Sequence, residues 1–180
     1  MRRRDFLRAG LLWGAGMALP LASTPAFAKL REQKRRELAF VNLHTDETLK
    51  AVYWADGRYR LDGLEAIDRV LRDHRTGDTY PIDVDLLDLL THLGRELGTT
   101  QPFHVISGYR SPATNHVLAS VSDGVAHASL HVEGKAIDIR VPGRRLKTVR
   151  RAALSLQAGG VGYYPVDDFV HVDVGRVRWW

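Results

Sequence analysis

The sequence predicts a single α+β domain in which a central antiparallel sheet packs against helices. Two observations carry this prediction. Most segments with helical spacing of apolar residues come before most of the strand-like segments, an order typical of α+β folds rather than of alternating α/β folds. The chain has 180 residues, a length that suits one domain with a substantial hydrophobic core.

The strand-like segments are rich in β-branched and aromatic residues. Residues 38–44 and 48–54 flank a short polar turn, so we expect them to pair as a hairpin. The other predicted strands are residues 103–109, 134–141, 160–165 and 169–175. Polar residues interrupt the apolar pattern inside the strands 134–141 and 169–175.

Four segments are predicted to be helices, and they are residues 61–77, 81–98, 111–120 and 144–160. In the first segment, Asp62 and Glu65 form a capping-box pattern, and we expect Gly77 to end the helix. In the second segment, Gly98 is the expected stop. In the third, Pro112 suits the first helical turn because its missing N–H would have no partner there.

The N-terminal 28 residues have the pattern of an export signal. A charged start is followed by an apolar stretch and by a small-x-small site that ends at Ala28. The segment RRDFLR, with Arg3 and Arg4 as the pair, resembles a twin-arginine signal. We therefore expect residues 1–28 to be a signal peptide, residues 29–37 a charged spacer and residues 38–180 the domain. An uncleaved anchor and the ordinary secretion route are the alternatives.

Most of the net positive charge of the chain comes from residues 1–28. The whole chain has 26 Lys and Arg residues against 21 Asp and Glu, and residues 1–28 hold four arginines and one aspartate. Their removal leaves 22 basic and 20 acidic residues, so the charge makes no case for nucleic-acid binding. The chain has no cysteine, and a metal site would therefore use histidines and carboxylates.

Three residues near the C-terminal strands could form such a site. Asp138 sits between two isoleucines in a strand, and a buried carboxylate is costly unless it is paired or bound to a metal. His131 precedes that strand, and His171 lies on the last one, on the same face as Asp173. Two imidazoles and one carboxylate would hold zinc and leave a fourth position for water. The alternative is that both histidines are structural and that Asp138 pairs with Arg110.

The motifs around these residues resemble those of a known family. The segment SLHVEGKAID (residues 129–138) fits the metal-binding signature of the zinc peptidases that include D-alanyl-D-alanine dipeptidases and carboxypeptidases. The segments SGYRS (residues 107–111) and GGVGYYPVDDFVHVDVG (residues 159–175) resemble two further parts of that family. Within it, the chain is most similar to the murein endopeptidase K branch.

This resemblance implies a Hedgehog/D-Ala-D-Ala-peptidase-like fold and roles for five residues. The zinc ligands would be His131, Asp138 and His171. Asp168, in an Asp-x-x-His spacing where many relatives have Glu, would be the general base, with the adjacent Asp167 as a rival. Arg110 would polarise the scissile carbonyl or stabilise the oxyanion.

The expected function is therefore that of an exported, periplasmic zinc peptidase acting on peptidoglycan stem peptides or their cross-links. The alternative is a non-catalytic, zinc-containing module that binds peptidoglycan. We expect peptidoglycan peptides as the partner, and neither nucleic acid nor a membrane span in the mature chain. We also expect Asp173 either to orient a zinc-binding histidine or to be a surface or turn-capping residue.

Overall fold

The computed structural model describes residues 34–121 and 128–180. The strands are β1 (Arg35–Asn42), β2 (Thr48–Ala55), β3 (Arg58–Tyr59), β4 (Phe103–Ser107), β5 (Ala136–Arg140), β6 (Gly160–Tyr164), β7 (Phe169–Asp173) and β8 (Arg178–Trp179). The helices are α2 (Leu61–Val70), α3 (Val84–Glu96), α4 (Pro112–Val121), the short 3₁₀ helix η1 (Leu130–Glu133) and α5 (Leu146–Leu156). The proposed signal peptide lies outside the described residues.

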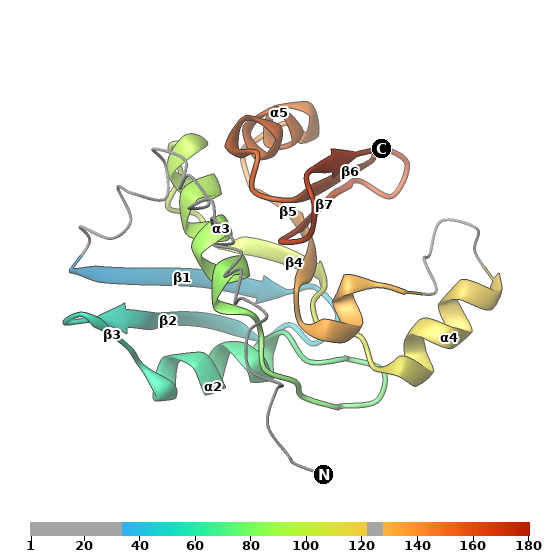
Figure 1. Cartoon of the computed structure of the whole chain (residues 1–180), viewed down its shortest axis with the longest axis horizontal. Coiled ribbons are helices and arrows are strands. Elements are labelled where there is room, and N and C mark those ends of the chain that lie inside the picture. Colours follow the sequence, from blue (N-terminus) through green and yellow to red (C-terminus); the bar gives the residue numbers. More distant parts are fainter. Residues whose placement is uncertain (1–33, 122–127) are drawn as a thin grey trace, which may run out of the picture.

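One sheet runs through the described part of the molecule, in the order β3-β2-β1-β4-β5-β7-β6-β8 (Figure 1). The predicted hairpin is present as β1 and β2. The sheet is mixed rather than purely antiparallel, because β1 pairs parallel to β4 and β6 pairs parallel to β8. A parallel pair needs a long crossover, and the chain between β1 and β4 supplies one through β2, α2 and α3.

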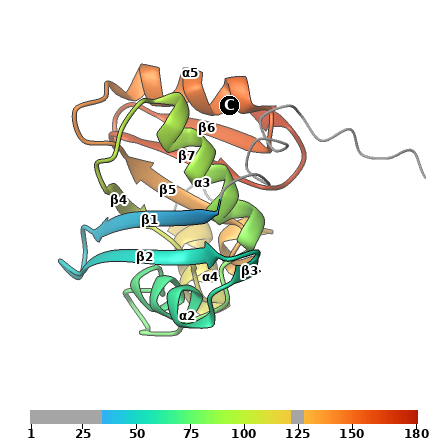
Figure 2. The ribbon, with the colours of Figure 1, turned by 90° about the vertical axis from the view of Figure 1, so that its left-hand side faces the viewer.

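The helices cover the sheet unevenly. Helix α3 crosses one face, and α4 lies behind the sheet in the same view (Figure 2). Helices α3 and α5 contact each other, and α5 packs on β6 and β7. The buried side chains of α3 include Leu86, Leu90 and Leu93, which form the core with residues from the strands. The other face of β5, β7 and β6 therefore remains for polar side chains.

The alternation of side chains along β5 and β7 separates these two faces. Ile137 and Ile139 are fully buried in the core, whereas Asp138 between them points to the opposite face. On β7, Val170 and Val172 join the core and His171 points the other way. Because Asp138 and His171 are directly paired across the two strands, their side chains meet on one face.

Two local predictions were wrong. Helix α2 begins after Arg60 with no side-chain cap, so Asp62 and Glu65 form no capping box; Asp62 lies in the first turn and pairs with Arg60. The helix ends at Val70 rather than near Gly77, which lies in a later turn with φ of 81°. The chain leaves the helix there because Asp73 organises the next residues through backbone hydrogen bonds.

The sheet also begins earlier than the predicted domain. Strand β1 starts at Arg35, so residues 35–37 of the predicted spacer belong to the sheet. Arg36 explains this extension because its side chain is buried and donates two hydrogen bonds to Asp88 of α3, at 2.8 and 2.9 Å. The Tyr53 hydroxyl donates to the same carboxylate at 2.8 Å, so the interaction joins β1, β2 and α3.

Candidate metal centre

His131, Asp138 and His171 converge on one point of the open sheet face. Each offers a ligand atom, and the three atoms lie within 4.8 Å of one another. His171 Nδ1 is 2.9 Å from Asp138 Oδ1 and 3.2 Å from His131 Nε2, and His131 Nε2 is 3.3 Å from Asp138 Oδ2. A tetrahedral ion with metal–ligand bonds of about 2.0 Å separates its ligand atoms by roughly 3.3 Å. All three side chains are buried.

The orientation of His131 is set by its own backbone and by β4. It lies in η1, whose first residues are capped by Ser129, and its Nδ1 is 2.7 Å from the carbonyl oxygen of Gly108. A carbonyl can only accept, so Nδ1 carries the proton and Nε2 presents a lone pair to the cluster. The β4–β5 pairing has a bulge between Val105 and Ser107, just before Gly108, where the strand turns toward η1.

Asp173 sets the orientation of His171 in the same way. His171 Nε2 is 3.0 Å from Asp173 Oδ2, so this nitrogen donates and Nδ1 faces the cluster. Asp173 is fully buried, and it also accepts hydrogen bonds from Gly160 N, Gly175 N and the guanidinium of Arg178. Asp173 is therefore not a surface residue: it is buried, it contacts His171, and it also caps the turn that follows β7 through Gly175 N.

This arrangement fits a cation. With both rings neutral, His131 Nε2 and His171 Nδ1 would face each other and the Asp138 carboxylate with lone pairs only, since both N–H groups are already donated. Three facing acceptors repel unless a proton or a metal ion lies between them. The donor set of two imidazoles and one carboxylate is the one that zinc takes in catalytic sites.

The pKa shifts describe the same electrostatics without a metal. Burial opposes ionisation of Asp138, but interactions with His131 and His171 outweigh it and hold the pKa of that carboxyl well below its usual range. Burial also disfavours a charged His171, yet hydrogen bonds to Asp138 and Asp173 raise the pKa of its imidazole to about 9. A proton therefore occupies the cluster of the metal-free chain at neutral pH.

Arg110 lies beside the cluster. Its side chain is buried, and its Nη2 is 3.6 Å from Asp138 Oδ2. It donates to Asn115 Oδ1 and Ser107 Oγ, each at 3.3 Å, and its Nε is buried without a partner among the described residues. Burial lowers the pKa of its guanidinium, which Asp138 partly offsets. The structure thus brings Arg110 to the three candidate ligands.

Asp73 anchors the segment that carries Arg110, and sequence reasoning missed it. It is almost fully buried, and its carboxylate accepts from Ser111 N and from Arg75 N, each at 2.9 Å. Burial alone would raise the pKa of Asp73, but the hydrogen bonds that its carboxylate accepts outweigh this effect and hold the pKa well below its usual range. Nothing local in the sequence links Asp73 to Ser111, because they are 38 residues apart.

Asp168, the predicted general base, does not contact the cluster. It lies in the turn before β7 with φ of 55°, a backbone conformation that Asp and Asn tolerate better than most residues. Its carboxylate is 3.2 Å from Arg140 Nε, and its side chain is 65% exposed. Its catalytic role stays a prediction.

Gly134 packs closely against the chain before α3. It ends η1 with φ of 66°, and a Cβ atom there would collide with the carbonyl oxygen of Pro81. Its own carbonyl accepts from Asp83 N at 3.0 Å. A side chain at this position would therefore push η1 and His131 away from the sheet.

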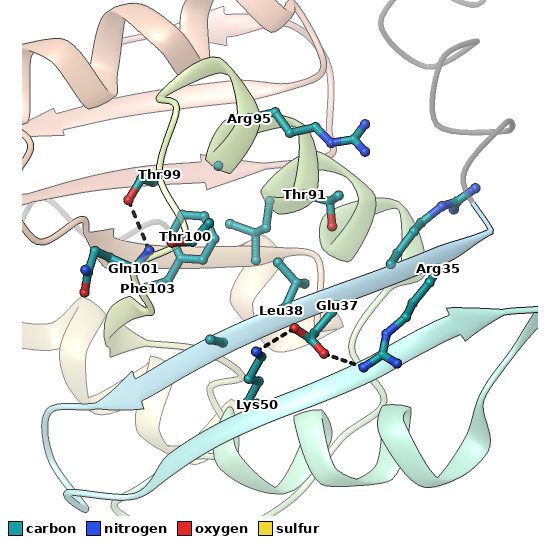
Figure 3. Close-up of a pocket in the computed structure, with 14 residues that line it drawn as sticks. Arg35, Glu37, Leu38, Lys50, Thr91, Arg95, Thr99, Thr100, Gln101 and Phe103 are labelled. Carbon is teal, nitrogen blue, oxygen red and sulfur yellow. Dashed lines mark hydrogen bonds and ion pairs between the residues drawn. The ribbon is translucent and has the colours of Figure 1, made fainter.

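A groove on the surface lies away from the cluster. This groove of about 320 Å³ is bounded by β1, β2, α3 and the start of β4 (Figure 3). Glu37 pairs with Arg35 at 2.7 Å and with Lys50 at 3.0 Å, and Arg95 points away from them. None of the candidate site residues lines this groove.

Comparison with known proteins decides the family. The family model described as peptidoglycan L,D-endopeptidase MepK matches residues 31–180. The chain belongs to this family. Relatives named peptidoglycan L,D-endopeptidase MepK from Escherichia coli and Shigella flexneri are 44% identical over 179 residues, which cover 99% of this chain and 96% of the relative. A relative from Haemophilus influenzae, named probable peptidoglycan L,D-endopeptidase MepK, is 36% identical over 99% of this chain and 95% of its own length.

Proposed function

We propose that the chain is a zinc-dependent endopeptidase that hydrolyses L,D bonds in peptidoglycan cross-links during cell-wall remodelling. The convergence of His131 Nε2, Asp138 and His171 Nδ1, with each of the two imidazoles oriented by a separate partner, is the observation that carries this proposal. The family and the names of its members support the peptide substrate and the L,D bond.

The three candidate ligands would hold the ion, and its chemistry when bound would be to lower the pKa of a water toward about 7 and to polarise a carbonyl. Gly108 and Asp173 keep the two imidazoles in the tautomers that a metal needs. Arg110, already buried and positively charged, would stabilise negative charge that develops on the scissile carbonyl oxygen.

The surface next to these residues offers room for the peptide. A hollow of about 290 Å³ lies between α4 and η1, and its lining includes Asn115, Ser129 and Val132. Asn115 accepts a hydrogen bond from Arg110, and Ser129 caps the helix that carries His131. A peptide that crosses the cluster could therefore place one side chain in this hollow.

The proposed general base is Asp168, acting after its carboxylate leaves Arg140. Such a base accepts a proton from the attacking water and returns it to the leaving amine, a contribution of typically about 10²–10⁴-fold. Asp168→Asn keeps a residue that tolerates the positive φ, so the turn should persist. We expect a fall in kcat of that size with unchanged zinc content, whereas Asp167→Asn, the matched control, should be unchanged. Near-normal turnover in Asp168→Asn would assign the base elsewhere.

The proposed reaction can be tested with purified muropeptide dimers. Dimers joined by an L,D bond should disappear in the presence of the protein, a chelator should stop the reaction, and added zinc should restore it. Dimers joined by a D,D bond are the comparison substrate and should persist. His171→Ala should lose metal and activity together, and full zinc occupancy in that variant would contradict the ligand set.

The second candidate function is a zinc-containing module that binds peptidoglycan without cleaving it. The exposed position of Asp168 and its pairing with Arg140 favour this alternative, because they leave the cluster without a contacting base. Stoichiometric zinc with L,D-linked dimers that remain intact would support it and exclude the hydrolase.

The proposed substrate lies outside the cytoplasmic membrane, so this function requires export. We propose that residues 1–28 direct the chain to the periplasm by the twin-arginine route. Within residues 34–121 and 128–180, no helix combines the length and apolar character needed to cross a membrane. Substitution of Arg3 and Arg4 by lysine should retain the protein in the cytoplasm, as cell fractionation would show.

A further inference from the structure

The last residue of the chain packs beside the candidate metal centre. The rings of Trp180 and His171 have centroids 5.3 Å apart. Trp180 N donates to Val161 O, and Trp180 O accepts from Tyr163 N at 3.1 Å, so the end of the chain continues alongside β6. Gly162, the residue paired with His171, leaves space for the indole, because a Cβ atom there would lie 2.8 Å from it.

Trp180 also binds Tyr164. The indole Nε1 is 2.8 Å from the Tyr164 hydroxyl, and an indole can only donate, so the hydroxyl oxygen accepts. The Tyr164 ring is fixed from a second side by stacking on Phe169, with centroids 4.5 Å apart and planes 17° apart. The hydroxyl proton of Tyr164 has no acceptor among the described residues, so it remains available to another molecule.

Tyr164 shares the sheet face of the cluster. It lies two residues beyond Gly162 on β6, so its side chain points to the same side as His171, roughly 7 Å further along the strand. Tyr163 points to the opposite side, where Arg150 lies over its ring. The cluster thus has Arg110 on one side and the hydroxyl of the half-buried Tyr164 on another.

We propose that Tyr164 donates a hydrogen bond to the bound peptide at the candidate metal centre, and that Trp180 holds the hydroxyl in the orientation this requires. The inference rests on the proposed function and adds a substrate-binding residue and a positioning residue to it. Stem peptides carry carbonyl and carboxylate oxygens, and either kind accepts such a bond.

The chain supplies a matched control for each residue. Tyr163→Phe is the control for Tyr164→Phe, because the two tyrosines are adjacent and face opposite sides of the sheet. Trp179→Phe is the control for Trp180→Phe, because Trp179 is 66% exposed and has no contact with Tyr164 among those that the structure shows. Phenylalanine at position 180 keeps an aromatic ring and removes the Nε1–H donor together with part of the indole surface that packs against Gly162.

The assay compares all four variants with the unaltered protein on the L,D-linked muropeptide dimer. Tyr164→Phe should lower kcat/KM by about 10- to 100-fold, the range for a hydrogen bond to a charged group, and Trp180→Phe by about 3- to 10-fold. The dissociation constant of the dimer for the chelator-treated protein, measured calorimetrically, should rise about tenfold in Tyr164→Phe. Zinc content should stay the same in every variant, and both controls should behave as the unaltered protein.

Different results overturn different parts of this reasoning. Unchanged cleavage and unchanged affinity in Tyr164→Phe would remove its role while leaving the endopeptidase intact. Loss of zinc in Tyr164→Phe would make the residue a support of the metal rather than a contact of the peptide, and would also overturn the proposal. If the unaltered protein neither binds nor cleaves the dimer, the proposed function fails, and the role of Tyr164 fails with it.

Discussion

Asp173→Asn tests how the structure orients the candidate metal ligand His171. All five hydrogen-bond partners of the Asp173 carboxylate are donors: His171 Nε2 and Arg178 Nη2 at Oδ2, and Gly160 N, Gly175 N and Arg178 Nη1 at Oδ1. An asparagine amide has one acceptor and one donor end. Either orientation of the amide therefore places an NH₂ group against at least two donors.

The size of the effect follows from these contacts. If the NH₂ end faces His171, the imidazole must flip its tautomer, and Nδ1 then carries a proton toward Asp138 instead of a lone pair toward the metal. Loss of such an orienting partner typically costs about 10- to 100-fold in metal affinity, or about 1.4–2.8 kcal/mol. Each buried donor left unsatisfied costs about 1–3 kcal/mol, so with two such donors we expect the metal-free protein to lose about 2–6 kcal/mol of stability.

Zinc affinity can be measured by competition with a chromophoric chelator at fixed pH, and stability by urea unfolding of the metal-free protein. Arg178→Met is the comparison variant, because it keeps the carboxylate, His171 and both backbone donors. It should weaken zinc binding by less than tenfold. Zinc affinity of Asp173→Asn equal to that of the unaltered protein would refute the claim that Asp173 controls the tautomer of His171.

Four further outcomes are expected. Arg110→Ala should fold and keep zinc but lose about 10²–10³ in turnover, and near-normal turnover would remove Arg110 from the reaction. Asp73→Asn should lower the unfolding midpoint by leaving one of its two backbone donors unpaired, and an unchanged midpoint in urea would contradict its anchoring role. Burial lowers the pKa of His74 to about 4, so the folded protein binds fewer protons than the unfolded chain as pH falls from 6.5 toward 4. Stability should therefore decrease over that window, and His74→Gln, compared by urea unfolding at pH 7 and 5, should lose less. Gly162→Ala should displace the Trp180 indole and change its fluorescence, whereas an unchanged emission spectrum would show that the indole is not held against this glycine.

Local patterns in the sequence predicted most elements of the fold. The apolar spacing in residues 81–98 predicted α3, and the alternation around Asp138 placed its side chain on the face opposite the core. The capping-box prediction at Asp62 and Glu65 failed because a local pattern does not show where the chain leaves β3 to begin α2. The prediction of a purely antiparallel sheet was wrong because β1 and β4 pair in parallel, and their relative direction depends on a long crossover between them.

The residue types of the candidate site could be predicted from the sequence, because the ability of an imidazole or a carboxylate to bind a metal is a property of the side chain itself. Their arrangement could not, since it depends on partners distant along the chain. The Gly108 carbonyl that orients His131 is a backbone atom with no signature in the sequence. The contact of Trp180 with Tyr164 exists because β8 pairs with β6. Distances and tautomers are set by packing between elements, so only the tertiary structure decided which groups face the cluster.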